Sequence, residues 1–282
     1  MRDAPGAKVA LHSNDGAALQ TLTPRLDLPA FFERIACAPA RVLMLDYDGT
    51  LAPFHVRPEC AVPYPEVMPV LEDIVAAGGT RVVIVSGRPA AEVPPLLRLA
   101  ERPEIWGSHG WERLLPDGRR TVEEPALDAR AALVEAGAAV ADLVPEGARL
   151  ERKLASIALH WRGLDEALAR GIAERGQAAW DPIAARGRVE TLRFDGGLEL
   201  RAVGCNKEHA VKAVLSETPP ESAIAYLGDD VTDEDAFRAL GSRGIGVLVR
   251  PQLRETAADV WIEPPAELVT FLRHWVVRRG VA

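Results

Sequence analysis

An apolar segment that ends at two closely spaced carboxylates constrains this sequence more than any other feature. Residues 42–45 are four consecutive apolar side chains, and Asp46 and Asp48 follow them at once. Such a run without polar alternation is typical of a strand buried on both faces of a parallel sheet. Open α/β sheets bind their ligands at the carboxyl ends of these strands. Because two acids so close repel each other, the pair requires a cation, a basic residue of a phosphate site, or a shared proton.

The same pattern of a buried strand that ends in polar residues recurs along the chain. Residues 80–85 are a second apolar strand that ends at Ser86, and residues 223–227 are another that ends near Asp229. A helical pattern over 65–77 separates the first two strands, so we expect a βαβ unit with parallel strands. The polar residues that follow the strands should therefore meet at one edge of the sheet.

The middle of the chain has a different pattern from its two flanks. Alternating strands, an Ala-rich helix and an Asp-Gly-Gly hairpin turn at 195–197 indicate an antiparallel α+β module. We place this module at 116–202, inserted between two parts of a parallel-sheet core at 29–115 and 203–282. Residues 1–28 show little periodicity and are predicted to form a weakly ordered arm. The predicted fold class is α/β with an inserted α+β domain.

Composition limits the classes of partner and the compartment. The chain has 282 residues, 48% hydrophobic and 26% charged, so it can bury a true core. Its net charge of -8 disfavours a nucleic-acid partner. The three cysteines form no CxxC pair, which favours free thiols in a reducing compartment. Because no apolar run approaches a membrane span and the N-terminus lacks a signal-peptide pattern, we expect a cytoplasmic protein with no membrane partner.

Polar residues that carry chemistry gather at the predicted strand ends and at the start of one helix: Asp46, Asp48, Ser86, Lys207, Asp229, Asp230 and Asp233. Hard oxygen ligands from separate strands suit Mg²⁺, and a metal between Asp46 and Asp229 would relieve their repulsion. A metal, a lysine and a hydroxyl are the groups that a phosphoryl transition state needs. We infer phosphoryl transfer, with an aspartate as covalent nucleophile and Asp48 as acid and base.

Taken singly, these residues also have structural explanations. Ser86 could be a helix N-cap, and Lys207 a solvated helix residue. Asp230 and Asp233 could favour a helix N-terminus, with Glu234 in its solvated first turn. Their occurrence together at several strand ends favours the functional interpretation. The sequence has neither a nucleotide P-loop nor a dinucleotide glycine motif, which disfavours those sites.

Four motifs carry a resemblance to known proteins: Asp46-x-Asp48-Gly-Thr-Leu, Ser86, Lys207 and Gly228-Asp229-Asp230-x-x-Asp233. They resemble the haloacid dehalogenase superfamily, over about residues 33–278. The resemblance implies a Rossmann-like core, a cap domain of α/β type, and Mg²⁺ held by the Asp46 carboxylate, the Asp48 carbonyl and Asp229. It also implies an Asp46 phospho-intermediate. The phosphoryl group would be held by Ser86, Gly87 and Lys207, while Asp230 and Asp233 would tune the surroundings of the metal and the lysine.

Longer segments carry a finer resemblance: Asp46-Tyr-Asp-Gly-Thr-Leu-Ala-Pro, Ser86-Gly-Arg, Gly107-Ser-His109-Gly, Glu151-x-Lys153, His160-x-Arg162, Leu198-Glu199-Leu-Arg201 and Gly228-Asp-Asp-x-Thr-Asp-Glu-Asp-x-Phe237. They resemble the trehalose-6-phosphate phosphatase family. By this resemblance Glu151, Lys153 and Glu199 would face the sugar hydroxyls. The substrate would also have Arg88, His109 and His160 nearby. Glu208 departs from the family, which usually has Gly after the lysine.

The implied reaction is Mg²⁺-dependent hydrolysis of trehalose 6-phosphate to trehalose and phosphate. Two alternatives stay open: a phosphatase for sucrose 6-phosphate or a hexose phosphate, and a catalytically silent module that binds a sugar phosphate. A phosphomutase is disfavoured, because nothing marks a means of protecting the phospho-aspartate from water. We expect a small-molecule sugar phosphate as the partner, no nucleic acid, and a monomeric protein.

Overall fold

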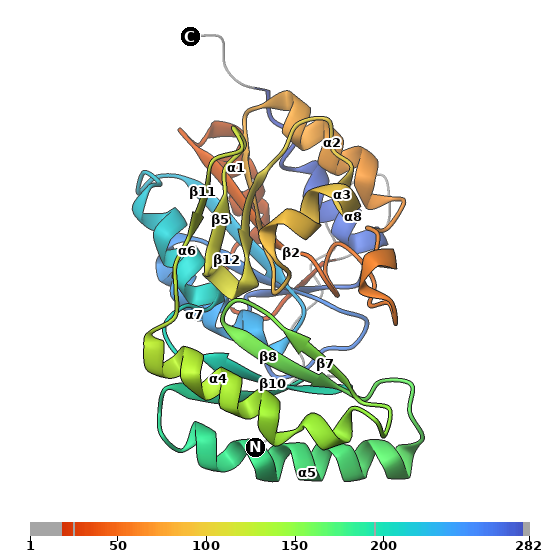
Figure 1. The fold of residues 1–282 in the computed structure, drawn as a ribbon. Helices are drawn as coiled ribbons and strands as arrows, with labels where there is room; N and C mark the ends of the chain where they lie inside the picture. The colour runs from red at the N-terminus through yellow and green to blue at the C-terminus, as the bar shows by residue number, and fades with distance from the viewer. Residues whose placement is uncertain (1–18, 25, 195, 279–282) are drawn as a thin grey trace. The chain divides into compact units, whose positions relative to one another are not determined.

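The computed structural model describes residues 19–24, 26–194 and 196–278, and the chain divides into two compact units. Met1–Thr121 and Asn206–Ala282 form the core unit, and Val122–Cys205 form the cap unit (Figure 1). The predicted insertion at 116–202 therefore begins and ends a few residues earlier than the observed division. The difference arises because the hairpin after residue 111 extends the sheet of the core unit instead of opening the cap unit.

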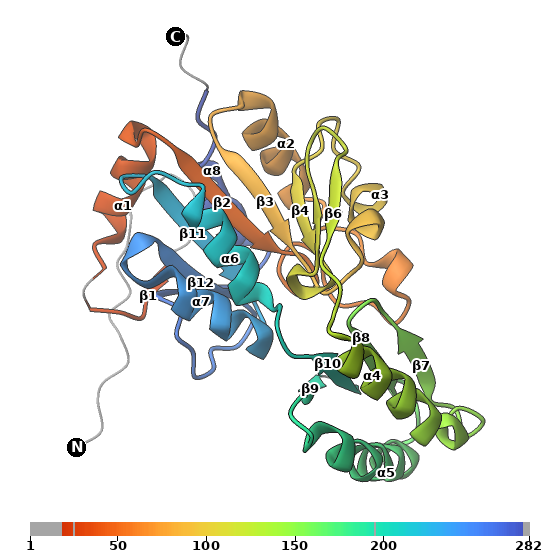
Figure 2. The ribbon, with the colours of Figure 1, turned by 60° about the vertical axis from the view of Figure 1, so that its left-hand side comes forward.

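A nine-stranded sheet in the order β1-β13-β12-β11-β2-β3-β4-β5-β6 organises the core unit (Figure 2). Its strands are β1 (Gln20–Thr21), β2 (Arg41–Asp46), β3 (Arg81–Val85), β4 (Glu104–Gly107), β5 (Glu112–Leu114), β6 (Arg120–Val122), β11 (Ala223–Gly228), β12 (Ile245–Val249) and β13 (Val260–Ile262). The strands from β13 to β4 run parallel, whereas β1 and β5 are antiparallel to their neighbours. The predicted α/β class with a largely parallel core sheet is confirmed.

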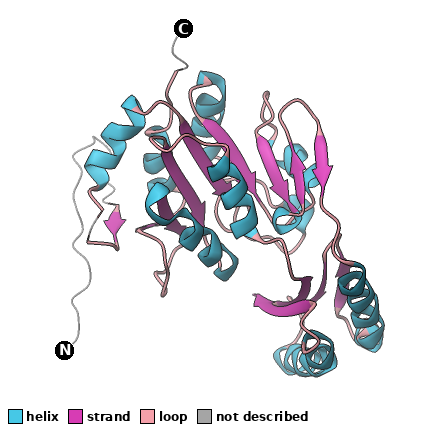
Figure 3. Ribbon diagram, turned by 90° about the vertical axis from the view of Figure 1, so that its left-hand side faces the viewer, coloured by secondary structure: helices cyan, strands magenta, loops and turns pink. Residues whose placement is uncertain are grey.

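Helices cover both faces of this sheet (Figure 3). Leu43 and Leu45 of β2 belong to one apolar cluster, with α1 (Leu28–Cys37), α2 (Val67–Ala77), α3 (Val93–Leu97) and α8 (Ala266–Arg273). Val42 and Met44 belong to another, with α6 (Lys207–Ser216) and α7 (Glu234–Leu240). Each fully buried side chain of this size contributes roughly 1.5–3 kcal/mol. Burial on both faces explains why these strands lack polar alternation and leaves their ends for polar residues.

Short 3-10 helices connect several of these elements: η1 (Pro58–Cys60), η2 (Ala90–Glu92), η3 (Ser108–Gly110), η4 (Ala141–Leu143), η5 (Val231–Asp233) and η6 (Gly241–Arg243). The helix η3 directly follows β4, and Asp229 and Asp230 separate η5 from the end of β11 (Ala223–Gly228). Within the part of the chain that the structure describes, no helix is both long and apolar enough to cross a bilayer. Cys37, Cys60 and Cys205 are free thiols.

Part of the predicted N-terminal arm belongs to the core sheet. Leu19 is buried, and Gln20 and Thr21 pair with Trp261 and Val260 of β13. The pairing covers a strand edge that would otherwise leave backbone groups without partners. The prediction of weak order is therefore wrong for these residues, and the rest of the arm, 1–18, lies outside the described residues.

The cap unit has an antiparallel sheet in the order β7-β8-β10-β9, with two helices on one side of it (Figure 1). Its elements are α4 (Leu127–Ala139), β7 (Arg149–Arg152), β8 (Ser156–His160), α5 (Glu166–Ala184), β9 (Val189–Phe194) and β10 (Gly197–Ala202). Gly176 of α5 lies against Leu159 and Leu198, which marks the apolar face of the sheet. Because side chains alternate along a strand, the opposite face carries the polar residues.

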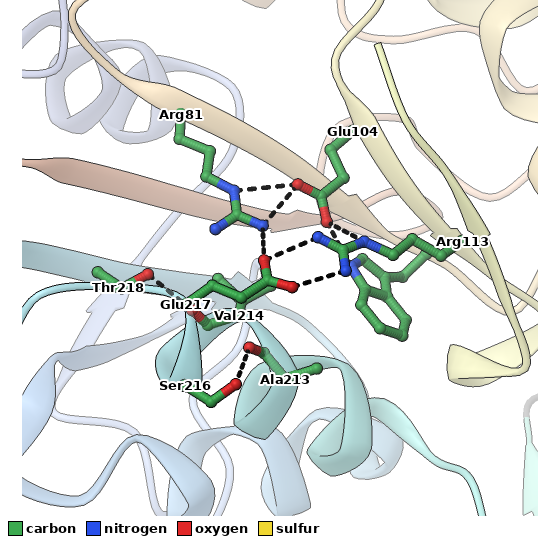
Figure 4. A network of polar contacts seen from close by, with 9 residues as sticks. Arg81, Glu104, Arg113, Ala213, Val214, Ser216, Glu217 and Thr218 are labelled. Carbon is green, nitrogen blue, oxygen red and sulfur yellow. Dashed lines mark hydrogen bonds and ion pairs between the residues drawn. The ribbon is translucent and has the colours of Figure 1, made fainter. Parts of the chain in front are cut away.

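An ion-pair network joins the C-terminal end of α6 to the first residues of β3 and β4 (Figure 4). Arg81 and Arg113 both bind Glu104, whose side chain is 5% exposed, and both also bind Glu217, which is 41% exposed. The Trp106 indole donates a further hydrogen bond to Glu104, at 2.8 Å. Glu104 is thus a buried carboxylate fully surrounded by donors, and it fixes the position of the helix end.

Replacing this buried carboxylate should destabilise the core unit. Glu104→Gln removes the buried one of the two carboxylates that Arg81 and Arg113 share, and we expect a loss of about 3 kcal/mol in the free energy of unfolding. Urea unfolding at pH 7 measures it. Asp117→Asn is the control, because the Asp117–Arg119 pair is exposed and should contribute little. Equally small losses in both variants would contradict a stabilising role for the network.

Candidate active site

The ends of β11, β2 and β3 lie side by side in the sheet. Asp46, the last residue of β2, pairs with Val85, which directly precedes Ser86. Leu227 of β11 pairs with the residue before Asp46, and Asp229 follows Leu227 by two positions. Register alone therefore brings Asp46, Ser86 and Asp229 to one edge of the sheet.

Lys207 lies between two carboxylates at this edge. Its Nζ is 2.6 Å from Asp46 Oδ1 and 2.7 Å from Asp233 Oδ1. The lysine is 4% exposed and begins α6, where Asn206 is the N-cap and accepts a hydrogen bond from the His209 amide. A solvated helix lysine, the structural alternative for this position, is therefore excluded.

The Asp233 carboxylate accepts hydrogen bonds from four donors. Oδ1 accepts from Lys207 and from the Tyr226 hydroxyl, at 2.7 and 2.6 Å. Oδ2 accepts from the amides of Asp229 and Asp230, at 3.1 and 3.0 Å. Because a carboxylate offers about four lone-pair positions, these bonds occupy it fully. Asp233 therefore positions its neighbours and has no lone pair left for a cation.

The remaining carboxylates fit a divalent cation. Oxygens of Asp46 and Asp229 lie within 4.8 Å of each other and equally near an oxygen of Asp233, which is already occupied by its four donors. Asp229 Oδ1 is buried and, among the described residues, has no hydrogen-bond partner. Gly49 makes room beside it, since a Cβ at this position would lie 2.1 Å from Asp229 Oδ2. A buried carboxylate oxygen without a partner is costly unless a cation binds it, and hard oxygen donors suit Mg²⁺.

The pKa values of the buried acids and of the lysine at this site are shifted. Burial raises the pKa of Asp46 to about 7, although Lys207 acts to lower it. Burial and the nearby Asp46 carboxylate raise the pKa of Asp229 well above its usual range. Burial acts to lower the pKa of Lys207, but the Asp233 and Asp46 carboxylates outweigh it and raise that pKa. The lysine thus stays charged, and one ammonium must balance three carboxylates.

Arg88 holds the carboxylate of Asp48. Its Nε and Nη2 donate to the two oxygens of Asp48, each at 2.6 Å. Nη1 donates to the Pro58 carbonyl, and the guanidinium lies 5.3 Å from the centre of the Tyr47 ring. A two-pronged pair of this kind fixes the orientation of both side chains. Arg88, predicted to lie near the substrate, therefore contacts the residue predicted to be the acid and base.

The loops that follow β3 and β4 are hydrogen-bonded to each other. The His109 amide donates to the Ser86 carbonyl at 2.9 Å, and the Ser108 amide donates to the Arg88 carbonyl at 2.7 Å. A Cβ at Gly87 would lie 2.6 Å from the His109 ring, so the two positions are in close contact. Ser108 and His109 have φ values of 50° and 57°, a conformation that costs energy outside glycine. Ser86, Gly87, Arg88 and His109 are thus brought together.

The polar face of the cap sheet carries the other residues predicted to bind substrate. His160 Nε2 lies 2.8 Å from Glu151 Oε2, and this hydrogen bond lowers the pKa of Glu151 to about 2. Lys153 Nζ lies 3.3 Å from Glu199 Oε1, which also accepts from the Ser156 hydroxyl at 2.6 Å. The cap unit therefore groups two pairs of charged side chains on one surface.

Two buried hydroxyls at the site had no role in the sequence prediction. Thr50 Oγ1 donates to Asp46 Oδ2 at 3.3 Å, and Tyr226 donates to Asp233 at 2.6 Å. Both residues are fully buried. Tyr226 could have been noticed, because a buried tyrosine within an apolar strand needs a partner for its hydroxyl.

The departure at Glu208 does not disturb the lysine. Glu208 pairs with Lys212 one turn along α6, where the Lys212 side chain is 63% exposed and that of Glu208 is 37% exposed. Lys207 instead contacts Asp46 and Asp233 in the interior. Consecutive residues of a helix diverge by about 100°, so Glu208 and Lys207 point in different directions.

Comparison with known proteins assigns residues 44–259 to the family model described as trehalose-phosphatase. A trehalose-phosphate phosphatase of Mycobacterium marinum is 33% identical over 248 residues, which cover 83% of this chain and 60% of that protein. The chain thus spans less than two thirds of this curated relative.

Two solved structures have a similar fold. The trehalose-6-phosphate phosphatase of Aspergillus fumigatus is 25% identical, with a TM-score of 0.62, over 90% of this chain and 98% of that one. The C-terminal domain of the C. albicans trehalose-6-phosphate phosphatase has a TM-score of 0.78 at 21% identity, over 91% of this chain and 98% of that one. The second likeness supports the fold alone.

Without a divalent cation, the protein should lose stability as the pH rises from 5 to 7. The Asp46 pKa is about 7 in the folded chain against 3.8 ordinarily, so the folded state binds more protons across this window. We expect the free energy of unfolding to fall by roughly 2 kcal/mol from this group. Urea unfolding with a chelator at several pH values measures it. Asp46→Asn should reduce the loss, and an unchanged loss in this variant would contradict the assignment.

Proposed function

This chain belongs to the trehalose-phosphatase family, and from that premise we propose that it hydrolyses trehalose 6-phosphate to trehalose and phosphate. One observation carries the proposal: the buried Asp46 carboxylate, held by Lys207, lies beside an Asp229 oxygen that has no hydrogen-bond partner among the described residues. Such a group of acids around one lysine is suited to a phosphoryl group and a cation, and ill suited to a neutral ligand.

Asp46 is the nucleophile of the proposed reaction. Lys207 and Thr50 each bind one of its oxygens and so fix the direction of the carboxylate. Attack on phosphorus releases the sugar and leaves a phosphoryl group on Asp46, as carboxylates do in aspartyl-phosphate enzymes. Lys207, the Ser86 hydroxyl and the Gly87 backbone bind the phosphoryl oxygens. Water then attacks the aspartyl phosphate and restores Asp46.

Asp48 is the acid and base of the same reaction. It donates a proton to the departing sugar oxygen and later takes one from the attacking water. Both oxygens of Asp48 accept from Arg88, so in the proposed reaction the pair separates to let Asp48 contact the sugar oxygen. Arg88 is then available to the anionic substrate.

Mg²⁺ is the proposed cofactor, held by the Asp46 and Asp229 carboxylates and the Asp48 carbonyl. The orphaned Asp229 oxygen supports this donor set. Bound Mg²⁺ supplies stabilisation of negative charge on the phosphoryl oxygens. Asp233 and Asp230 act on the same loop through backbone hydrogen bonds, since Asp233 binds the amides of both Asp229 and Asp230.

The charged pairs of the cap unit are proposed to bind the sugar. Carboxylates and an ammonium can each bind several hydroxyls, and a disaccharide offers many. The arrangement of Glu151 with His160, and of Lys153 with Glu199, supports this role, because it concentrates these groups on one polar face. His109 of the core unit, with its unusual backbone conformation, is proposed as a further residue that binds substrate.

Phosphate release from trehalose 6-phosphate, with and without Mg²⁺, tests the central proposal. The parent protein should release phosphate only with the metal. Asp46→Asn should lower the rate by at least about 10³-fold, because no other group can accept the phosphoryl group. Asp117→Asn should retain the parental rate.

A panel of sugar phosphates tests the substrate. Equal rates on trehalose 6-phosphate, sucrose 6-phosphate and glucose 6-phosphate would remove the trehalose assignment and leave a general sugar phosphatase. Saturable binding of these compounds with no phosphate release would instead indicate a silent binding module.

Replacing Lys153 should separate sugar binding from chemistry. Lys153→Ala should raise KM for trehalose 6-phosphate by about 10-fold with a smaller effect on kcat, because its contact is with the unreactive part of the substrate. Hydrolysis of p-nitrophenyl phosphate, which lacks the sugar, should be unchanged. Arg193→Ala is the control, since Arg193 bonds Gln177 of α5 and lies on the helix side of the sheet. Equal losses on both substrates would contradict a role in sugar binding.

A further inference from the structure

Two arginines that follow β12 bind the backbone of the loop that carries Asp229. Arg254 Nη2 donates to the Asp230 carbonyl at 2.8 Å and to the Asp229 carbonyl at 3.4 Å. Arg250 Nη1 donates to the same Asp229 carbonyl at 3.3 Å. Because β12 runs parallel to β11, with Leu248 opposite Gly228, both segments leave the sheet at the same edge.

Arg254 is itself held by a buried acid. Its Nη1 pairs with Glu234 Oε1 and also donates to the Glu255 carbonyl at 2.8 Å. The other oxygen of Glu234 accepts from the Ala257 amide at 2.7 Å, and Glu234 is 7% exposed. The structural alternative that placed Glu234 in a solvated first turn is therefore excluded for this residue. Its carboxylate connects α7 to the segment after β12.

The peptide groups around Asp229 are thus bound from two sides. Asp233 accepts from the amides of Asp229 and Asp230, and Arg254 donates to the carbonyls of the same two residues. With the backbone fixed in this way, the direction of the Cα–Cβ bond of Asp229 is set before anything binds. Asp229 Oδ1, the buried oxygen without a partner among the described residues, is the atom so presented.

We propose that Arg254, fixed by Glu234, is a positioning residue that presents the Asp229 carboxylate to the divalent cation. The inference rests on the proposed function, because it uses the same cation site. Arg254 touches neither carboxylate oxygen of Asp229 and acts through the backbone. Glu234 neutralises its charge, so the loop is held without adding repulsion toward the cation. Groups that orient a metal ligand in this way typically change metal affinity by about 10–100-fold.

Calorimetric titration of Mg²⁺ into chelator-treated protein, without substrate, tests the role directly. Arg254→Gln should weaken Mg²⁺ binding by about 10-fold. Arg254→Lys, which keeps the charge but loses the fork of donors, should weaken it less. Arg238→Gln is the matched control, because Arg238 pairs with Asp235 on the surface of α7, the helix that also carries Glu234. It should leave Mg²⁺ affinity at the parental value.

Measuring phosphate release at several Mg²⁺ concentrations distinguishes a positioning role of Arg254 from a purely structural one. For Arg254→Gln, the Mg²⁺ concentration that gives half-maximal phosphate release should rise about 10-fold, and high Mg²⁺ should restore most of the rate. A purely structural role would lower the melting temperature without moving this concentration. Unchanged Mg²⁺ affinity in both folded Arg254 variants would overturn the inference. If Arg254→Gln does not fold, the Mg²⁺ affinities of Arg254→Lys and Glu234→Gln are measured instead.

Asp229→Asn distinguishes this inference from the proposed function. If Asp229→Asn loses Mg²⁺ binding while the Arg254 variants keep it, the cation site stands and the positioning role of Arg254 is wrong. If Asp229→Asn also binds Mg²⁺ with parental affinity, the proposed cation site itself is wrong, and the role of Arg254 falls with it.

Discussion

The charge balance around Lys207 is the constraint on which the rest of the site depends. One buried ammonium contacts Asp46 and Asp233, while a third carboxylate, Asp229, keeps one oxygen without a partner among the described residues. An unpaired buried charge costs several kcal/mol, so the arrangement is stable only with protons on the acids or with an added cation. Burial, together with the neighbouring carboxylates, raises the pKa values of Asp46 and Asp229, and the same uncompensated negative charge is the source of the proposed affinity for Mg²⁺.

The charged residues of this site keep their positions because contacts outside the site fix the elements that carry them. The lysine begins α6, and the far end of this helix is fixed by the Glu104 and Glu217 ion pairs. The Asp229 loop is bound on one side by Asp233 and on the other by Arg254. Strands buried on both faces supply the common platform. Like charges that repel one another stay in place because each is attached to an element with its own independent packing.

The sequence was informative where local pattern decides structure. Uninterrupted apolar runs identified the strands, and parallel register then required Asp46, Ser86 and Asp229 to meet. The contacts that escaped prediction join residues distant in the chain. Arg88 pairs with Asp48 across 40 positions and Arg254 with Glu234 across 20, and no local periodicity encodes either partner. The strand β1 was not predicted for a related reason. Its two residues form a strand only because they pair with the edge strand β13, which is distant in the sequence.

Under the proposed function, the two units have different tasks in recognising a sugar phosphate. The core unit holds the groups that respond to charge, and every one of them could act on any phosphate ester. The cap unit holds paired acids and bases suited to hydroxyls, and it is a separate folding unit with its own sheet and core. If the cap residues bind the sugar as proposed, substitutions on the polar face of β7, β8 and β10 would change substrate choice without altering the charge balance around Lys207. For the same reason, a fold shared with known phosphatases specifies the chemistry more strongly than it specifies the sugar.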